Sequence, residues 1–207
     1  MGTAGQGVTI CLIDDGTAHD HPNLKNHIWQ NPGEIPGNGI DDDGNGFADD
    51  VRGWNFLTNT NDTYGLEHGT RTAGLIVGDG SVPDFAGNQW VTGVAPEAKL
   101  MITVIGTTQS SFWACEQYGI AMGADLISSS HSFKWVVGDF PDYHLFRAMS
   151  DAELAAGVLH VNSSGNQGND PNYPVPFNIP APANSPPRSA TISRFPRGSR
   201  ARSRSAP

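Results

Sequence analysis

The chain has 207 residues, of which 37% are hydrophobic, and a formal net charge of −9. This length suits one domain with a sizeable core, and no apolar run reaches the roughly 18 residues of a membrane-spanning helix. Residues 188–207 hold six of the twelve Lys and Arg and no acid, so the rest of the chain carries six bases against 21 acids. The sequence therefore predicts no membrane segment, and the acidic body argues against nucleic acid as a partner.

Apolar, β-branched runs alternate with helical patterns along the chain, which is typical of an α/β fold. In chain order, the predicted elements are a strand at 8–14, a helix at 70–77, a strand at 99–105, a helix at 110–122, a strand at 125–129, a helix at 143–156 and a strand at 158–162. Strand–helix–strand units of this length predict a parallel sheet. Residues 30–53 are rich in Gly, Asp and Asn and are predicted to form an ordered loop, whereas the Pro-dense segment 171–187 is predicted to be extended.

The N-terminal residues and the cysteines give limited information. Residues 1–7 are small and polar and contain neither the basic nor the apolar region of a signal peptide. This leaves either a cytosolic protein or a chain that begins after its export segments. Cys11 lies in an apolar run, as expected of a small buried side chain. The sequence does not decide whether Cys11 and Cys115 form a disulfide.

Three short motifs contain residue types that often take part in catalysis or binding. Asp14, followed by Asp15 and a glycine, ends the first predicted strand, where open α/β sheets place their ligands. His68 stands at the start of a predicted helix, and Asn166 follows the strand at 158–162. Each motif alone has a plain structural explanation as a turn or a helix cap.

Taken together and in this order, the motifs resemble those of subtilisin-like serine proteases. The family motifs D-[ST]-G, H-G-T-H-x-A-G and G-N correspond to residues 14–16, 68–74 and 165–166, and segment 124–130 is similar to the strand that lines the family's substrate cleft. The resemblance covers about residues 5–187. It implies part of a three-layer α/β fold in which helices flank a parallel sheet, and an extracellular location.

The resemblance also implies a role for each matching residue. His68 would act as the general base and Asp14 would orient its imidazole ring. Asn166 would donate its side-chain amide to the oxyanion of the tetrahedral intermediate. Ser130 would help to pair the backbone of a peptide or protein substrate as an added strand.

Four residues depart from the family pattern. Asp15 replaces a Ser or Thr, and strand alternation predicts that its carboxylate points to the opposite face from that of Asp14. Arg71 and Thr72 replace the usual His and Val or Ile, and an outward Arg71 would leave His68 undisturbed. His131 follows Ser130 where a small or apolar residue is common, and it is a candidate for shaping the substrate pocket.

The family's nucleophilic serine stands in a G-T-S-M-A motif well beyond the G-N turn. The serines after Asn166 stand in other contexts: Ser185, Ser189, Ser193, Ser199, Ser203 and Ser205. We therefore expect a serine endopeptidase domain interrupted before its Ser, inactive as given. The alternative is a catalytically dead relative that acts as a calcium-dependent peptide-binding or scaffold module.

Composition changes abruptly after Pro187, so we divide the chain into a peptidase part, 1–187, and an Arg- and Ser-rich tail, 188–207. The tail could bind RNA or another anionic surface, or form a disordered linker. A change this abrupt inside a region that still resembles the family favours a third interpretation, out-of-frame translation.

An acidic loop at 38–50 fits the D-x-D-x-[DN]-G opening of a calcium loop, in which oxygens at alternating positions surround a hard cation. The predicted Ca²⁺ ligands are Asp41, Asp43, Asn45 and Asp49, with Asp50 as the alternative to Asp49. Position twelve is Arg52 and no flanking helices are evident, so the loop is not an EF-hand. The alternative is a solvated acidic turn.

Overall fold

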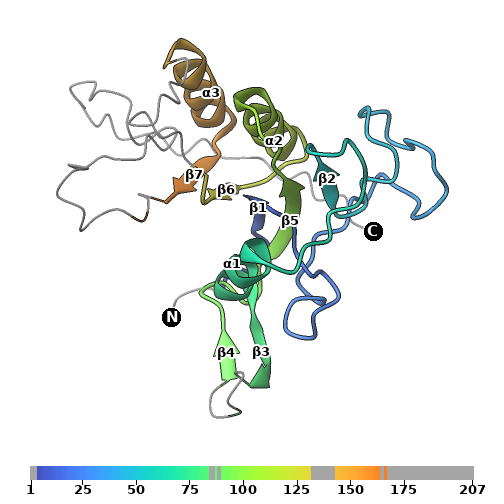
Figure 1. Cartoon of the computed structure of the whole chain (residues 1–207), viewed down its shortest axis with the longest axis vertical. Coiled ribbons are helices and arrows are strands. Elements are labelled where there is room, and N and C mark those ends of the chain that lie inside the picture. Colours follow the sequence, from blue (N-terminus) through green and yellow to red (C-terminus); the bar gives the residue numbers. More distant parts are fainter. Residues whose placement is uncertain (1–3, 84–86, 88–89, 132–142, 164–165, 167–207) are drawn as a thin grey trace, which may run out of the picture.

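The computed structural model of the chain describes residues 4–83, 87, 90–131, 143–163 and 166. Its centre is a five-stranded parallel sheet with the order β2-β5-β1-β6-β7 (Figure 1). The strands are β1 (Thr9–Asp14), β2 (Gly53–Asn55), β5 (Lys99–Val104), β6 (Leu126–Ser129) and β7 (Leu159–Asn162). No helix in these described ranges is long and apolar enough to cross a membrane.

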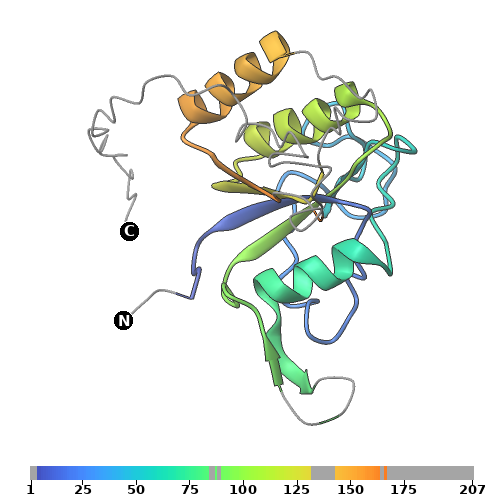
Figure 2. The same ribbon diagram turned by 60° about the vertical axis from the view of Figure 1, so that its left-hand side comes forward.

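Helices cover both faces of the sheet, which gives three layers (Figure 2). Helix α1 (His68–Val77) lies on one face, and α2 (Gln109–Ala121) and α3 (Tyr143–Ala156) lie on the other. The predicted α/β fold is therefore confirmed. Every predicted strand and helix is present, with bounds that differ by two residues at most.

Alternating side chains of β1 build the two halves of the core, because successive strand residues point to opposite faces. Leu12 is fully buried in a cluster with Ala73 and Val77 of α1. Ile13 is buried in a second cluster with Phe112 and other residues of α2. A strand covered on both faces reads as a continuous apolar run, which is why the sequence revealed it.

The register of the strands brings the carboxyl ends of β1, β5 and β6 to the same edge of the sheet. β1 pairs with β5 from Thr9 opposite Lys99 to Asp14 opposite Val104, and Ile13 lies opposite Ser129 of β6. Because the strands are parallel, their carboxyl ends form one edge of the sheet. The end of β1 therefore lies beside the residues that follow β6.

Three short strands were not predicted. β3 (Asp79–Pro83) and β4 (Trp90–Thr92) form a two-stranded antiparallel hairpin after α1, and β2 pairs in parallel with β5. Gly53, in β2, has a φ of 124°, and a Cβ there would collide with the carbonyl oxygen of Ile102. Only glycine permits this close approach of two backbones.

Cys11 and Cys115 are both buried free thiols, so the two cysteines form no disulfide. Burial raises the pKa of the Cys11 thiol to about 12 and also raises that of Cys115. Both side chains belong to the core between the sheet and α2. The segments 171–187 and 188–207 lie outside the described residues.

Candidate active site

The end of β1 and the start of α1 bring Asp14 and His68 together. Nδ1 of His68 lies 2.8 Å from Oδ1 and 2.9 Å from Oδ2 of Asp14. The Asp14 side chain is only 7% exposed, whereas that of His68 is 56% exposed. With the ring proton on Nδ1, the imidazole donates to a buried carboxylate and keeps its Nε2 lone pair available as a base.

Asp15 performs a different task from Asp14. Its carboxylate accepts the backbone N–H of His68 at 3.2 Å and that of Gly69 at 2.7 Å. Glu67, which precedes α1, contributes no capping side-chain hydrogen bond. Asp15 therefore satisfies the first N–H groups of α1 from outside the helix, as an N-cap side chain normally does.

The expectation that Asp14 and Asp15 face opposite sides is wrong. Both carboxylates reach the first turn of α1, because β1 ends at Asp14 and Asp15 already begins the turn. One carboxylate binds the imidazole ring and the other binds the helix backbone. The carboxylate of Asp15 therefore has a structural role at the helix end and does not bind the imidazole.

The residues after His68 hold α1 against this turn. A Cβ at Gly69 would collide with the carbonyl oxygen of Gly16, so this close approach requires glycine. Thr70 donates its hydroxyl to the carbonyl oxygen of Gly65 at 2.6 Å and accepts the N–H of Ala18 at 2.8 Å. His68 thus supplies the imidazole, Gly69 allows the close contact with Gly16, and the hydroxyl of Thr70 links Gly65 to Ala18 through hydrogen bonds.

A cavity of about 300 Å³ opens beside the Asp14–His68 pair. It is lined by Ile13, Asp14, Asp15, His68, Ile105, Ser130 and His131. Ser130 directly follows β6 and is exposed, and the ring of His131 packs 5.2 Å from that of Phe112. The structure therefore brings Ser130 and His131 to the same cavity as Asp14 and His68.

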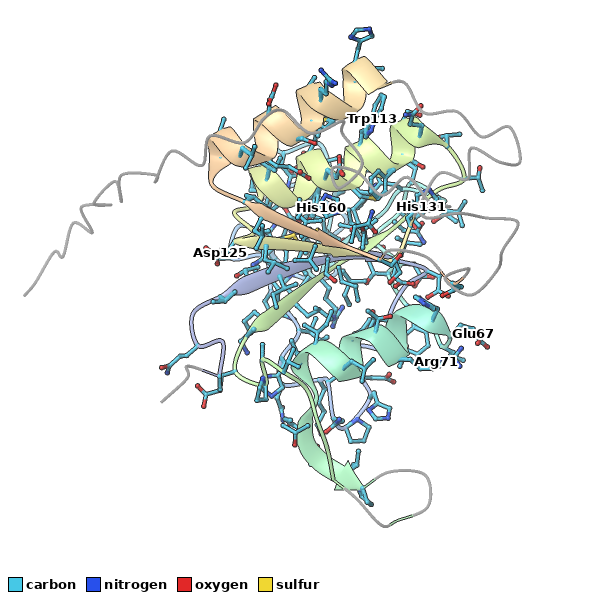
Figure 3. The ribbon with its side chains drawn as sticks, turned by 90° about the vertical axis from the view of Figure 1, so that its left-hand side faces the viewer. Glu67, Arg71, Trp113, Asp125, His131 and His160 are labelled. Atoms are coloured by element: carbon cyan, nitrogen blue, oxygen red, sulfur yellow. The ribbon has the colours of Figure 1, made fainter. Side chains whose placement is uncertain are left out.

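Arg71 points away from this cavity. It pairs with Glu67 at 3.2 Å, and both side chains are more than 70% exposed. Figure 3 shows both residues at the N-terminal end of α1, directed outward. Of the two cases that the sequence left open, Arg71 therefore has the outward orientation that would leave His68 undisturbed, and solvent screens its charge.

Asn166 follows β7 and is exposed. The residues on either side of it, 165 and 167, lie outside the described residues. Its position as an oxyanion donor therefore stays a prediction.

The acidic loop gathers carboxylates around Glu34, which the sequence pattern did not indicate. Candidate ligand oxygens of Glu34, Asp41 and Asp43 all lie within 4.8 Å of one another. Glu34 is 7% exposed, and its carboxylate also accepts the N–H groups of Asp42 and Asp49, each at 2.8 Å. An all-oxygen set of this kind fits a hard cation such as Ca²⁺.

The other two predicted ligands, Asp49 and Asn45, make hydrogen bonds within the loop. Asp49 accepts the N–H groups of Gly37 and Gly39 at 2.7 Å each. The side-chain amide of Asn45 donates to Asp43 at 3.2 Å and to Asp50 at 2.9 Å. No sequence motif identified Glu34, because it precedes the D-x-D-x-N-G run.

Tyr118 of α2 ties the loop to the body of the domain. Its hydroxyl donates to the fully buried carboxylate of Asp50 at 2.6 Å. Burial and this carboxylate raise the pKa of Tyr118.

Comparison with known proteins identifies the family. The Subtilase family profile matches residues 5–195, which extends beyond Pro187. The chain is 37% identical to subtilisin-like protease 1 of Plasmodium falciparum (isolate 3D7) over 168 residues, which cover 76% of this chain and 22% of that protein. It is 30% identical to the major intracellular serine protease of Bacillus subtilis (strain 168), over 86% of this chain and 50% of that protein.

Solved structures share the fold. The crystal structure of MycP1 without its N-terminal propeptide matches with a TM-score of 0.52 and 22% identity, over 81% of this chain and 45% of that one. The epidermin leader peptide processing serine protease EpiP (S393A mutant) from Staphylococcus aureus matches with a TM-score of 0.51 and 19% identity, over 80% of this chain and 39% of that one. The chain thus spans about a quarter of the length of the Plasmodium relatives and less than half of these solved chains. It belongs to the subtilase family of serine proteases.

Proposed function

We propose that this chain supplies the Asp–His part of a serine endopeptidase site that hydrolyses peptide bonds in peptide or protein substrates. The observation that carries the proposal is the pairing of His68 Nδ1 with both carboxylate oxygens of Asp14, at 2.8 and 2.9 Å, beside a cavity. This is the arrangement of a general base and the group that orients it. The exposed ring of His68 supports the same role, because a base must reach its substrate.

In this proposal, Nε2 of His68 takes the proton of a serine hydroxyl as the serine oxygen bonds to the scissile carbonyl carbon. The same proton then passes to the leaving amine nitrogen when the C–N bond breaks. Asp14 stabilises the imidazolium that forms between these two transfers. Asn166 donates to the carbonyl oxygen while it carries negative charge, and the backbone around Ser130 pairs with the substrate.

A second candidate is a catalytically dead subtilase that binds peptides. The observation in its favour is that the exposed Ser130 lines the cavity beside Asp14 and His68. On this proposal the cavity beside Ser130 binds an extended peptide but does not cleave it.

We also propose that the loop from Glu34 to Asp50 binds Ca²⁺ as a structural ion. Glu34, Asp41 and Asp43 supply the ligand oxygens, and Asn45 and Asp49 keep the loop in shape. An extracellular location would suit an enzyme that depends on bound Ca²⁺. Relatives include the minor extracellular protease Vpr and the major intracellular serine protease, both of Bacillus subtilis, so family membership alone does not assign the compartment.

A fluorophosphonate probe distinguishes the two functions, because it labels only a serine that a nearby base activates. The gene is first read past Pro187 in the other two frames, and any form that carries a G-T-S-M-A motif is expressed beside residues 1–207. We expect labelling and peptidase activity in the longer form, both lost in His68→Ala, and neither in residues 1–207. Labelling that survives His68→Ala would overturn the proposal. A genuine stop after Pro207, together with peptide binding by the isolated chain, would favour the binding module.

A further inference from the structure

Three ionisable side chains meet inside the layer between the sheet and its two covering helices. Glu116 comes from α2, Glu153 from α3 and His160 from β7, beneath both helices (Figure 3). Their side chains are 1%, 4% and 0% exposed. Nδ1 of His160 lies 2.9 Å from Oε1 of Glu153 and 3.2 Å from Oε1 of Glu116. The cluster lies in the core, and none of its three side chains lines the cavity at Asp14 and His68.

One ring nitrogen cannot satisfy two buried carboxylates with its single proton. Nδ1 carries at most one hydrogen, so it donates fully to only one of the two acids. The second oxygen of Glu116, Oε2, is buried and has no hydrogen-bond partner among the described residues. Two carboxylates and one imidazolium also leave a net negative charge in the core, which is strongly unfavourable.

The far side of the ring is fixed by another buried group. Nε2 of His160 lies 2.8 Å from the hydroxyl oxygen of Ser129, and Ser129 is 3% exposed. If Nε2–H donates to Ser129, the lone pair of Nδ1 is directed at the two carboxylates. A histidine that donates from one nitrogen and offers the other to a cation is the usual arrangement of a metal ligand.

We propose that Glu116, Glu153 and His160 bind a divalent transition-metal ion of the zinc class. Two carboxylates, a neutral imidazole and a divalent ion sum to zero charge. In a tetrahedral zinc site with bonds of about 2.0–2.1 Å the ligand atoms lie about 3.4 Å apart, and the two carboxylate oxygens lie 2.9 and 3.2 Å from Nδ1 of His160. The mixed nitrogen and oxygen set suits zinc, in contrast to the all-oxygen set of the acidic loop. Such an ion would join α2, α3 and β7 at one point.

Metal titration of residues 1–207 tests this inference. The chain is purified in a chelator, dialysed, and titrated with Co²⁺ while visible absorption is recorded; Zn²⁺ is then used to displace the Co²⁺. We expect about one equivalent of Zn²⁺ per chain by elemental analysis. Binding should weaken as pH falls, because a proton competes for the ligands.

Isosteric variants separate this site from the acidic loop. Glu116→Gln and Glu153→Gln should each weaken zinc binding at least about tenfold, and Ser129→Ala should weaken it by about tenfold through the second nitrogen of the ring. The matched control, Asp41→Asn with Asp43→Asn, should leave zinc binding unchanged. Near-UV circular dichroism establishes that each variant keeps its packing.

Two results would overturn the inference. One is a wild-type chain that binds no Zn²⁺ or Co²⁺ and gains no order when zinc is present during refolding. The other is zinc binding that persists in both Gln variants and disappears in the control. In either case a proton, and not a metal ion, holds the three side chains together.

Discussion

The carboxylate of Asp15 accepts the backbone N–H of Gly69 at 2.7 Å, across 54 positions of sequence. A side chain outside α1 thereby caps the helix that presents His68. Asp15→Ala should lower the free energy of unfolding by about 0.5–2 kcal/mol, the usual cost of losing an N-cap side chain. Asp15→Asn, which keeps an acceptor oxygen, should cost less.

Urea denaturation measures these differences. Glu67→Ala is the matched control, since Glu67 adjoins the same helix end, is exposed and does not cap it. We expect that control to stay within about 0.5 kcal/mol of the wild type. Equal losses from Asp15→Ala and Glu67→Ala would contradict the capping role.

Asp14 and Asp15 should differ sharply in their effect on catalysis. In a longer form that carries the nucleophilic serine, Asp14→Asn should lower kcat by about 10⁴, the loss measured for this change in serine proteases with the same triad. Asp15→Asn should have a much smaller effect, because its carboxylate binds backbone N–H groups and not the ring. Steady-state kinetics on one peptide substrate compares the two. If the two variants lost activity equally, Asp14 would not be the sole orienting acid.

Calcium should raise the melting temperature, because an ion that binds only the folded state stabilises it by mass action, by about 2.7 kcal/mol at one hundred times Kd. Glu34→Gln should abolish most of the calcium response, since Glu34 holds both the cation cluster and the backbone of Asp42 and Asp49. Scanning calorimetry with calcium and with a chelator records the shift. Asp62→Asn serves as the control, because Asp62 lies between β2 and α1 and is not part of the Glu34–Asp41–Asp43 cluster. An identical melting temperature in calcium and in chelator would contradict the proposal that this loop binds Ca²⁺.

The two thiols should resist alkylation in the folded chain. Burial raises the pKa of Cys11 to about 12, which lowers its thiolate fraction at pH 8 by more than about a thousandfold relative to a free cysteine. Iodoacetamide labelling, followed by mass spectrometry, should modify neither residue in buffer and both in denaturant. Rapid labelling of Cys115 in buffer would show that the core between α2 and the sheet opens.

The buried strands and helices could be predicted from the sequence, because each face of an element that packs against another element needs apolar side chains. The run at 8–14 is apolar on both faces since helices cover both sides of β1. Segments such as Asp79–Pro83, with a glycine and a proline, become strands only through their partners. Local pattern therefore could not reveal the hairpin.

The same distinction holds for the sites. Asp14 and His68 were found because each stands in a family motif. Glu34, Glu116 and His160 stand in no motif, and only the fold brings each of them to its neighbours. A side chain whose partners are distant in sequence leaves no local signal.

The central place of β1 has a consequence for how the polypeptide matures. The N–H of Thr9, at the start of this strand, donates to Asp125, 116 positions later, and both neighbours of β1 are made long after it. During translation β1 therefore leaves the ribosome before both of the strands that flank it, and its apolar side chains lack those partners until then. Such non-local pairing slows folding and leaves aggregation-prone surface exposed in the meantime. Aggregation of the incomplete sheet is therefore the main route by which this chain would lose folded protein.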